Sequence, residues 1–184
     1  MSEKIECNPV LLKSPRLTLR PISLDGLDDF HEYSMDEEFY EYLEFPAFKN
    51  ITESKEYLLK LINRSASPSQ QYWFIQENLS QKVIGSFGVH SLDQSRRSIE
   101  IGYGLSSRYW SKGYFKEATN IVLDYLFIDL SLQRVVARTF ETNQASIKGL
   151  ERLGFQVEGI MRDYYRKHND QWFNAILMAK LRND

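Results

Sequence analysis

The sequence predicts a single mixed α/β domain, and three observations support this fold class. Short segments with an apolar residue at every second position recur along the chain, which is typical of strands. Segments with apolar residues three and four positions apart lie between them and predict amphipathic helices. The length of 184 residues suits one substantial core. We therefore expect about seven strands and about four helices in one domain over residues 1–184, with its core at about 15–182.

The first half of the chain predicts three strands and two helices. The strands are residues 16–22, 71–76 and 83–89, and the last two are neighbours in sequence and in the sheet. Leu27, Phe30 and His31 have helical spacing and predict the first helix. Asn50 and Glu53 resemble a capping box, which predicts the start of a second helix that runs through residue 62.

The second half predicts four strands and two helices. The strands are residues 99–105, 134–139, 155–166 and 171–181, and the last two form a closing hairpin. The helices are residues 115 to about 129 and residues 143–153. Asn143 is the N-cap of the second of these helices, and Gly154 ends it. Only a helix separates the first two strands, so we expect them to be parallel neighbours joined by a right-handed crossover.

Composition and charge exclude several classes of function. The formal net charge of −2 gives no general attraction to nucleic acid or to an anionic membrane. Three His and one Cys argue against a zinc site made by the protein. Cys7 is the single cysteine and cannot form an internal disulfide, so we expect a cytoplasmic protein. We place Cys7 in a mobile N-terminal segment with no role as a nucleophile, and we expect neither a signal peptide nor a membrane span.

Residues 25–44 contain nine acidic residues and neither Lys nor Arg. Aromatic residues are interleaved with them and continue to Phe45 and Phe48. One interpretation is an amphipathic helix with a solvated acidic face. The other is an acidic, aromatic wall that attracts an amine-bearing cation and includes Phe45 as a substrate contact. The two interpretations are compatible, and the sequence leaves both open.

A small basic turn, Arg108-Tyr-Trp-Ser-Lys-Gly113, joins the strand over residues 99–105 to the following helix. This order places free backbone N–H groups and a helix N-terminus around one small volume, which suits a phosphate or pyrophosphate. The turn matches neither Gly-x-x-x-x-Gly-Lys-Ser/Thr nor the dinucleotide pattern Gly-x-Gly-x-x-Gly. It resembles the acyl-CoA pyrophosphate loop Arg/Gln-x-x-Gly-x-Gly/Ala of the GNAT superfamily of N-acetyltransferases. The residues around it look most like the RimJ/RimL branch of that superfamily.

One position departs from the motif, because Ser111 stands where the family has its first glycine. If this position needs a positive φ, serine costs roughly 1 kcal/mol or more. Its hydroxyl could instead contact a phosphate.

A second motif follows at the expected distance, one helix and one strand later. Asn143-x-x-Ser146, followed by Leu153-Gly-Phe155, resembles the other GNAT signature, Asn-x-x-Ser with Leu-Gly-Phe. The resemblance therefore extends over residues 17–181.

The resemblance implies a mixed, strongly bent sheet whose two central strands splay apart near residues 102–105. Acetyl-CoA is the implied co-substrate, with its pantetheine in the gap and no metal ion. Main-chain groups of Gly104 and Leu105 would bind the pantetheine, and Asn143 would contact the coenzyme from the next helix. The pyrophosphate would be held by Arg108, Trp110, Ser111, Lys112, Gly113 and Tyr114. The alternative for Arg108 and Lys112 is that they are ordinary solvated charges.

The implied reaction is direct attack of an amine on the acetyl thioester in a ternary complex. An ammonium must first lose a proton, and the thiolate leaves more easily beside a hydrogen-bond donor. Glu100 could act as the base through water, or it could be a structural carboxylate paired with an arginine. Ser146 could donate to the sulfur, or it could be a satisfied helix hydroxyl. We expect Tyr103 to line the substrate pocket, and no base role is carried over to Tyr165.

Three functions remain open at this stage. The first is an N-acetyltransferase of the RimJ/RimL type, acting on a protein N-terminus such as that of a ribosomal protein, or on a small amine. An α-amino group has a pKa of about 8, whereas the pKa of a lysine side chain is about 10.4, so an α-amino group needs less help from a base. The base candidates in this sequence are weak, which favours a protein N-terminus or a small amine as the acceptor. The second is a non-catalytic acyl-CoA-binding module, and the third is a nucleotide binder. The resemblance also allows a homodimer.

Overall fold

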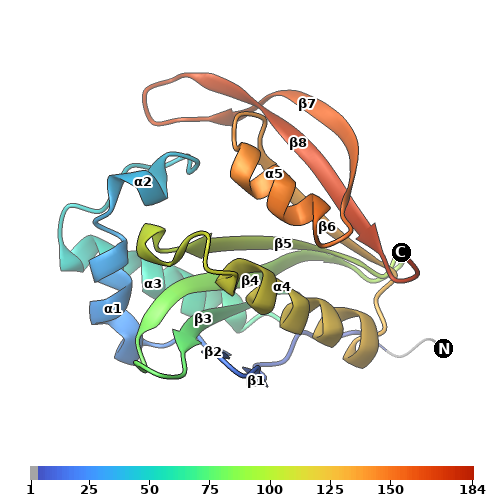
Figure 1. Cartoon of the computed structure of the whole chain (residues 1–184), viewed down its shortest axis with the longest axis horizontal. Coiled ribbons are helices and arrows are strands. Elements are labelled where there is room, and N and C mark those ends of the chain that lie inside the picture. The colour runs from blue at the N-terminus through green and yellow to red at the C-terminus, as the bar shows by residue number, and fades with distance from the viewer. Residues whose placement is uncertain (1–3) are drawn as a thin grey trace.

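A computed structural model describes residues 4–184, so residues 1–3 of the predicted domain and of the polar N-terminal segment lie outside the described residues. An eight-stranded sheet forms the centre, in the order β1-β2-β3-β4-β5-β6-β8-β7 (Figure 1). The strands are β1 Leu12–Lys13, β2 Leu17–Pro21, β3 Gln71–Glu77, β4 Val83–Asp93, β5 Ser98–Leu105, β6 Arg134–Phe140, β7 Gln156–Arg166 and β8 Trp172–Leu181. Within the described chain, β5 and β6 are parallel and the other neighbouring pairs are antiparallel, so the sheet is mixed as predicted.

The helices are α1 Leu27–Tyr33, α2 Glu37–Tyr40, α3 Ile51–Ser65, α4 Tyr114–Asp124 and α5 Gln144–Glu151. The seven predicted strands and four predicted helices are confirmed, with ends that differ by a few residues. The sequence does not predict β1 and α2, because two and four residues are too few for a periodic pattern. A π-helical turn, Tyr125–Asp129, extends α4 to its predicted end. None of the helices formed by residues 4–184 has the length and apolar character needed to cross a lipid bilayer.

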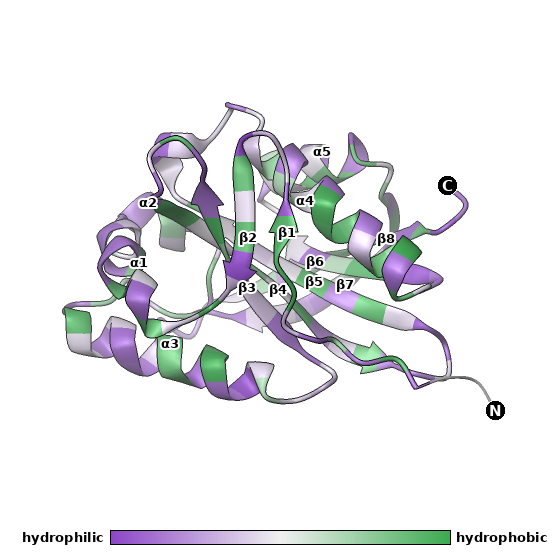
Figure 2. Ribbon diagram, turned by 90° about the horizontal axis from the view of Figure 1, so that it is seen from below, coloured by the Kyte–Doolittle hydropathy of each residue, from purple (hydrophilic) through white to green (hydrophobic). Residues whose placement is uncertain are grey.

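Helices cover both faces of the sheet, and β3 shows this most directly. Its neighbouring residues Trp73 and Phe74 are both fully buried, in two different cores. Trp73 belongs to the core under α4, together with Val122, whereas Phe74 packs with Phe30 of α1 and Leu58 of α3. A strand that is covered on both faces needs no polar alternation, which explains the unbroken apolar run in β3. Figure 2 shows apolar and polar residues alternating along α3, as expected for a helix with one face on the sheet.

Strands β5 and β6 are paired at their beginnings and separate after Ile101 and Ala137. Their parallel pairing runs from Ser98 and Arg134 to Ile101 and Ala137, and then it stops. Beyond that point β5 stays paired with β4 as far as Leu105, while β6 stays paired with β8. The facing edges of β5 and β6 therefore have no strand partner among the described residues. The predicted splay of the central strands is confirmed.

The expectation of a mobile segment around Cys7 is wrong. The Cys7 side chain is only 2% exposed, and its backbone N–H donates to the Pro68 carbonyl at 2.7 Å. The backbone N–H of Ile5 donates to Gln94 Oε1 at 3.0 Å, which fixes the same segment two residues earlier. The polar composition of this segment hid its two apolar anchors, Ile5 and Cys7, both of which are buried in the core under α4.

We predict that Cys7 is chemically inert in the folded protein. Burial raises the pKa of its thiol to about 11, so very little thiolate forms near neutral pH and the sulfur is shielded from reagents. A thiol-reactive chromogenic reagent should leave the native protein unmodified for hours and should titrate one thiol immediately in guanidinium chloride. Rapid modification of the native protein would contradict the burial.

Candidate active site

The turn before α4 has the backbone that the predicted phosphate loop requires. Gly113 is the N-cap of α4 and has φ 82°, and Ser111 has φ 59°, so both motif positions are left-handed. No side chain among residues 4–184 caps this helix N-terminus, which leaves the first N–H groups of α4 available to a ligand. Ser111 therefore stands at a position that favours glycine, which is the case considered above in which this motif position needs a positive φ.

Arg16 ties the turn to the first strand, and the sequence alone does not single it out. Its Nη1 donates to the Lys112 carbonyl at 3.0 Å, and its Nε donates to Glu117 Oε2 at 2.6 Å. The Arg16 backbone N–H also donates to Glu117 Oε1 at 3.0 Å. The guanidinium carbon lies 4.5 Å from the centre of the Tyr114 ring. The start of β2, the turn and the first turn of α4 are thus held together by one residue about a hundred positions away in sequence.

Several predicted coenzyme contacts around the turn already have protein partners, including Tyr114, whose hydroxyl donates to Glu77 Oε1 at 2.6 Å. The Trp110 indole Nε1 donates to the Leu105 carbonyl at 2.6 Å, so this carbonyl is satisfied within the chain. Arg108 Nη1 lies 2.5 Å from Glu32 Oε1 of α1, which directs its charge toward the acidic segment. Lys112 keeps its ammonium 5.4 Å from the Tyr109 ring, at the edge of the turn. Lys112 and the backbone are therefore the free cationic and N–H groups of the turn.

The open end of the gap brings together three predicted site residues, one from β5 and two from the start of α5. The hydroxyls of Tyr103 on β5 and Ser146 on α5 are 2.7 Å apart. The Asn143 side chain caps α5 and accepts a hydrogen bond from the Ser146 backbone N–H at 3.0 Å. Burial raises the pKa of the Tyr103 phenol, so it stays protonated and can donate. The gap therefore contains a pair of linked hydroxyl donors.

Glu100 lies on the face of β5 opposite to that of Tyr103. The residue is 7% exposed, and its carboxylate Oε2 lies 2.9 Å from Arg138 Nη1 on β6. Burial raises the pKa of Glu100, and the charge of Arg138 opposes that rise. Arg138 Nη1 also donates to the Tyr164 hydroxyl at 2.8 Å. Glu100 is therefore part of an ion pair between the two strands that separate just beyond it.

His90 is a site residue that the sequence analysis missed. It lies opposite Glu100 in the β4–β5 register, with its Nδ1 3.0 Å from Ser91 Oγ and 4.0 Å from Glu100 Oε2. Burial lowers the pKa of His90 below its usual 6.5, and the charges of Arg138 and Arg64 lower it further. A neutral imidazole near neutral pH is able to accept a proton. Residues 4–184 contain no group of three or more His, Cys, Asp or Glu side chains placed to bind a metal ion.

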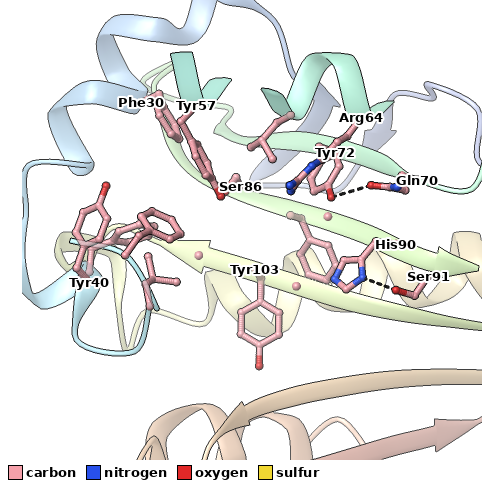
Figure 3. A pocket seen from close by; sticks show the side chains of 18 of the residues that line it. Phe30, Tyr40, Tyr57, Arg64, Gln70, Tyr72, Ser86, His90, Ser91 and Tyr103 are labelled. Atoms are coloured by element: carbon pink, nitrogen blue, oxygen red, sulfur yellow. Dashed lines mark hydrogen bonds between the residues drawn. The ribbon is translucent and has the colours of Figure 1, made fainter. Parts of the chain in front are cut away.

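An aromatic pocket of about 650 Å³ lies on the same side of the sheet as Glu100 and His90 (Figure 3). The rings that line it are Phe30, Phe39, Tyr40, Phe45, Phe48, Tyr57 and Tyr72. The predicted substrate contact Phe45 is among them, with its ring centre 5.2 Å from that of Tyr57. Tyr103 also borders the pocket, but its ring is directed away, toward the gap. The two predicted substrate residues therefore lie on different faces of the sheet.

The acidic and aromatic side chains of the segment 25–48 do not form one wall. This corrects the interpretation of the segment as an acidic, aromatic wall that attracts an amine-bearing cation. Of the described residues that line the aromatic pocket, none is Asp or Glu. Five of the nine acidic residues border a second cavity of about 520 Å³, beside Lys82 and Arg108: Asp29, Glu32, Asp36, Glu37 and Glu38. Lys82 Nζ and Arg108 Nη1 both pair with Glu32, at 3.0 and 2.5 Å. Local periodicity did not reveal this separation because α2 redirects the chain between the two surfaces.

We predict opposite effects on stability at the two left-handed positions of the turn. Ser111→Gly should raise the free energy of unfolding by up to about 1 kcal/mol, because glycine adopts this φ without strain. Gly113→Ala should lower it by about 1 kcal/mol or more. Gly159→Ala is the matched control, since a Cβ there meets no described atom within 4 Å and its φ is ordinary. Urea unfolding measures all three, and a stabilising Gly113→Ala would refute the assigned turn geometry.

We also predict that His90 titrates below 6.5. Its imidazole loses more hydration than it gains in stabilising charge, so protonation is disfavoured in the fold and occurs only as the pH falls. NMR titration of the imidazole signals measures this directly, because the chain has three His and His90→Gln identifies the relevant signal. A midpoint at or above 6.5 would show that the ring is not desolvated.

Comparison with known proteins agrees with this geometry. Residues 16–156 match the family model described as the acetyltransferase (GNAT) domain. Among curated relatives, the chain is 35% identical over 154 residues to p20 of Bacillus licheniformis, named as an uncharacterized N-acetyltransferase, covering 83% of this chain and 86% of that one. A GCN5-related N-acetyltransferase from Brucella melitensis has the same fold, with TM-score 0.88 and 20% identity over 98% of this chain and 82% of that one.

A second solved structure is that of the acetyltransferase MccE, determined in complex with acetyl-CoA and AMP. It superposes with TM-score 0.81 and 21% identity, covering 91% of this chain and 93% of that one. The uncapped N-terminus of α4, the two left-handed residues before it and the unpaired strand edges suit an extended ligand that ends in a diphosphate. The chain therefore belongs to the GNAT family of acetyltransferases, and it is an N-acetyltransferase with acetyl-CoA as its co-substrate.

Proposed function

We propose that this enzyme transfers the acetyl group of acetyl-CoA directly to a primary amine in a ternary complex, as a RimJ/RimL-like member of the family in the cytoplasm. The acceptor is a protein N-terminal amine or a small amine. The observation that carries the proposal is the gap between β5 and β6, which has hydroxyl donors on one face and a carboxylate with an imidazole on the other. One curated relative, 24% identical over 91% of this chain, is named as the spermidine N(1)-acetyltransferase of Vibrio cholerae, and its name gives a small amine as the acceptor.

The proposed coenzyme site follows the α4 side of the gap. The first N–H groups of α4, at Gly113 and Tyr114, bind the pyrophosphate with Ser111 and Lys112. Main-chain groups of Gly104 and Leu105 bind the pantetheine along the unpaired edge of β5, and Asn143 closes the site from α5. Trp110 supports this edge through its bond to Leu105, and Arg108 acts through its pair with Glu32. An uncapped helix end beside an unpaired strand edge supports this arrangement.

In the reaction, the amine nitrogen forms a bond to the acetyl carbon while the carbon–sulfur bond breaks. We assign Ser146 as the donor to the departing sulfur. Serine alone is a weak acid, but here its oxygen lies 2.7 Å from the Tyr103 hydroxyl. Tyr103 can donate to Ser146 while Ser146 donates to sulfur, and such linked hydrogen bonds strengthen one another. The pair stabilises charge that develops on the thiolate.

The proton of the incoming ammonium leaves on the other face of β5. We assign Glu100 and His90 jointly to this step. The neutral His90 imidazole accepts the proton, directly or through water, and the Glu100 carboxylate 4.0 Å away stabilises the imidazolium that results. Burial raises the pKa of Glu100, and the charge of Arg138 opposes that rise and so favours the carboxylate. In this proposal Glu100 acts through His90. Both interpretations of Glu100 from the sequence are therefore kept, since it assists the base and is also the partner of an arginine.

We predict that Ser146→Ala and Glu100→Gln each lower kcat at least about tenfold while changing the affinity for acetyl-CoA little, because each removes an interaction made mainly in the transition state. Thiol release with a panel of amines and N-terminal peptides measures kcat, and calorimetry measures acetyl-CoA binding. Glu151→Gln on the exposed face of α5 is the matched control.

Two outcomes would count against this assignment. Unchanged kcat in both variants would remove the catalytic roles while leaving the family intact. Tight acetyl-CoA binding without thiol release from any amine would instead favour the non-catalytic acyl-CoA-binding module. Buried Cys7 contributes no background to the thiol readout.

A further inference from the structure

We infer that the aromatic pocket selects a primary amine with an aromatic or large apolar body and an anionic group, such as an aromatic amino acid or a derivative of one. The inference rests on the proposed function and names its acceptor class. The inferred acceptor differs from a polycation, which is the acceptor that the acidic residues of α1 and α2 favour when the sequence is considered alone.

The walls of the pocket fit an aromatic body. Its seven rings surround about 650 Å³, a size typical of sites for small molecules. Phe45, Phe48 and Tyr57 form one continuous group of rings, with centres 5.2 to 5.9 Å apart. Aromatic rings at these separations attract a further ring beyond the effect of area burial alone.

The opposite end of the pocket is polar and positively charged. Figure 3 shows Arg64, Gln70, Tyr72, His90 and Ser91 grouped there, away from Phe30, Tyr40 and Tyr57. Arg64 lies in the last turn of α3 and has no carboxylate within 4 Å among the described residues. A guanidinium beside a pocket without carboxylates binds a carboxylate or a phosphate through charge-assisted hydrogen bonds.

The charges of the site disfavour a polycation. The described lining of the pocket includes Arg64 and no acidic residue, and the nearby Glu100 is already paired with Arg138. The carboxylates of α1 and α2 border the other cavity, where Lys82 and Arg108 pair with Glu32. A second positive charge on the acceptor would therefore meet Arg64 without compensation.

Gly102 keeps the floor of the pocket open beside His90. A Cβ at Gly102 meets one described atom within 4 Å, His90 Nε2 at 3.8 Å, and its φ is ordinary. A larger side chain is therefore tolerated by the backbone and would fill the space next to the imidazole. By contrast, a Cβ at Gly88 or Gly104 would strike the Tyr72 or Phe39 ring at less than 3 Å. Gly102 is thus the position at which the pocket can be blocked without disturbing its walls.

The test compares acceptors that differ by one group. Thiol release is measured with phenylalanine and tryptophan, with phenylethylamine and tryptamine, which lack the carboxylate, with an O-phosphorylated aromatic amine, and with spermidine. We expect kcat/KM to fall about tenfold or more when the anion is removed, because a hydrogen bond to a charged group is lost, and to be lowest for spermidine. The phosphorylated compound distinguishes a carboxylate site from a phosphate site.

Variants assign the effect to the pocket. Arg64→Gln should lower kcat/KM for the anionic acceptors about tenfold and leave the acceptors without an anion unchanged. Arg152→Gln, which changes the exposed arginine at the C-cap of α5, should affect neither group of acceptors. Gly102→Val should raise KM for every aromatic acceptor without changing the affinity for acetyl-CoA.

A preference for spermidine that survives Arg64→Gln would overturn the inference and leave the proposed function in place. If no amine releases thiol, the proposed function fails, and calorimetric binding of the same compounds decides the inference alone. Arg64-dependent binding of the anionic aromatic compounds would then support it, and equal binding by Arg64→Gln would overturn it.

Discussion

The separation of β5 from β6 after Ile101 and Ala137 is the constraint on which the rest of the site depends. Each strand keeps its outer partner, so neither can follow the other: β5 remains bound to β4 through Leu105, and β6 remains bound to β8 through Phe140. Unpaired backbone groups cost free energy when they are buried without a partner. The edges of the gap are therefore stable when exposed to water or when bound to a ligand that supplies amide groups, as the pantetheine of acetyl-CoA does.

The alternation of a single strand divides the chemistry between two faces. In β5, Tyr103 points toward α5 and Ser146, whereas Glu100 and Gly102 lie on the other face of the strand, which is the face of His90 and the aromatic pocket. A continuous sheet would keep these two groups apart, because its strands would seal the layer between them. The gap removes this barrier beside Tyr103, so the hydroxyl pair that we propose as the donor to the leaving sulfur and the imidazole that we propose as the acceptor of the amine proton could serve the same reacting carbon from opposite sides.

The sequence predicts those parts of the site that depend on local backbone geometry. The turn at residues 108–113 and the cap at Asn143 both follow from spacing, since a few consecutive residues determine them. The contacts of Arg16 with Glu117, and of Glu100 with Arg138 and His90, join residues far apart in sequence and leave no periodic trace. The same reason explains why the acidic and aromatic residues of residues 25–48 look like one surface in the sequence and occupy two in the structure.

Arg138 connects the electrostatics of the site to its chemistry. A carboxylate buried as deeply as Glu100 tends to take up a proton, and the guanidinium 2.9 Å away opposes this. The same guanidinium disfavours a charge on His90. The pair Glu100–Arg138 is neutral as a whole, the imidazole is neutral, and Arg64 adds a positive charge at the pocket. The described lining of the pocket adds no carboxylate, and the nearby positive charges would lower the pKa of an ammonium that enters, so that it would lose its proton more easily. The residues that make the pocket a poor site for a cation are therefore the ones that favour the neutral, nucleophilic amine.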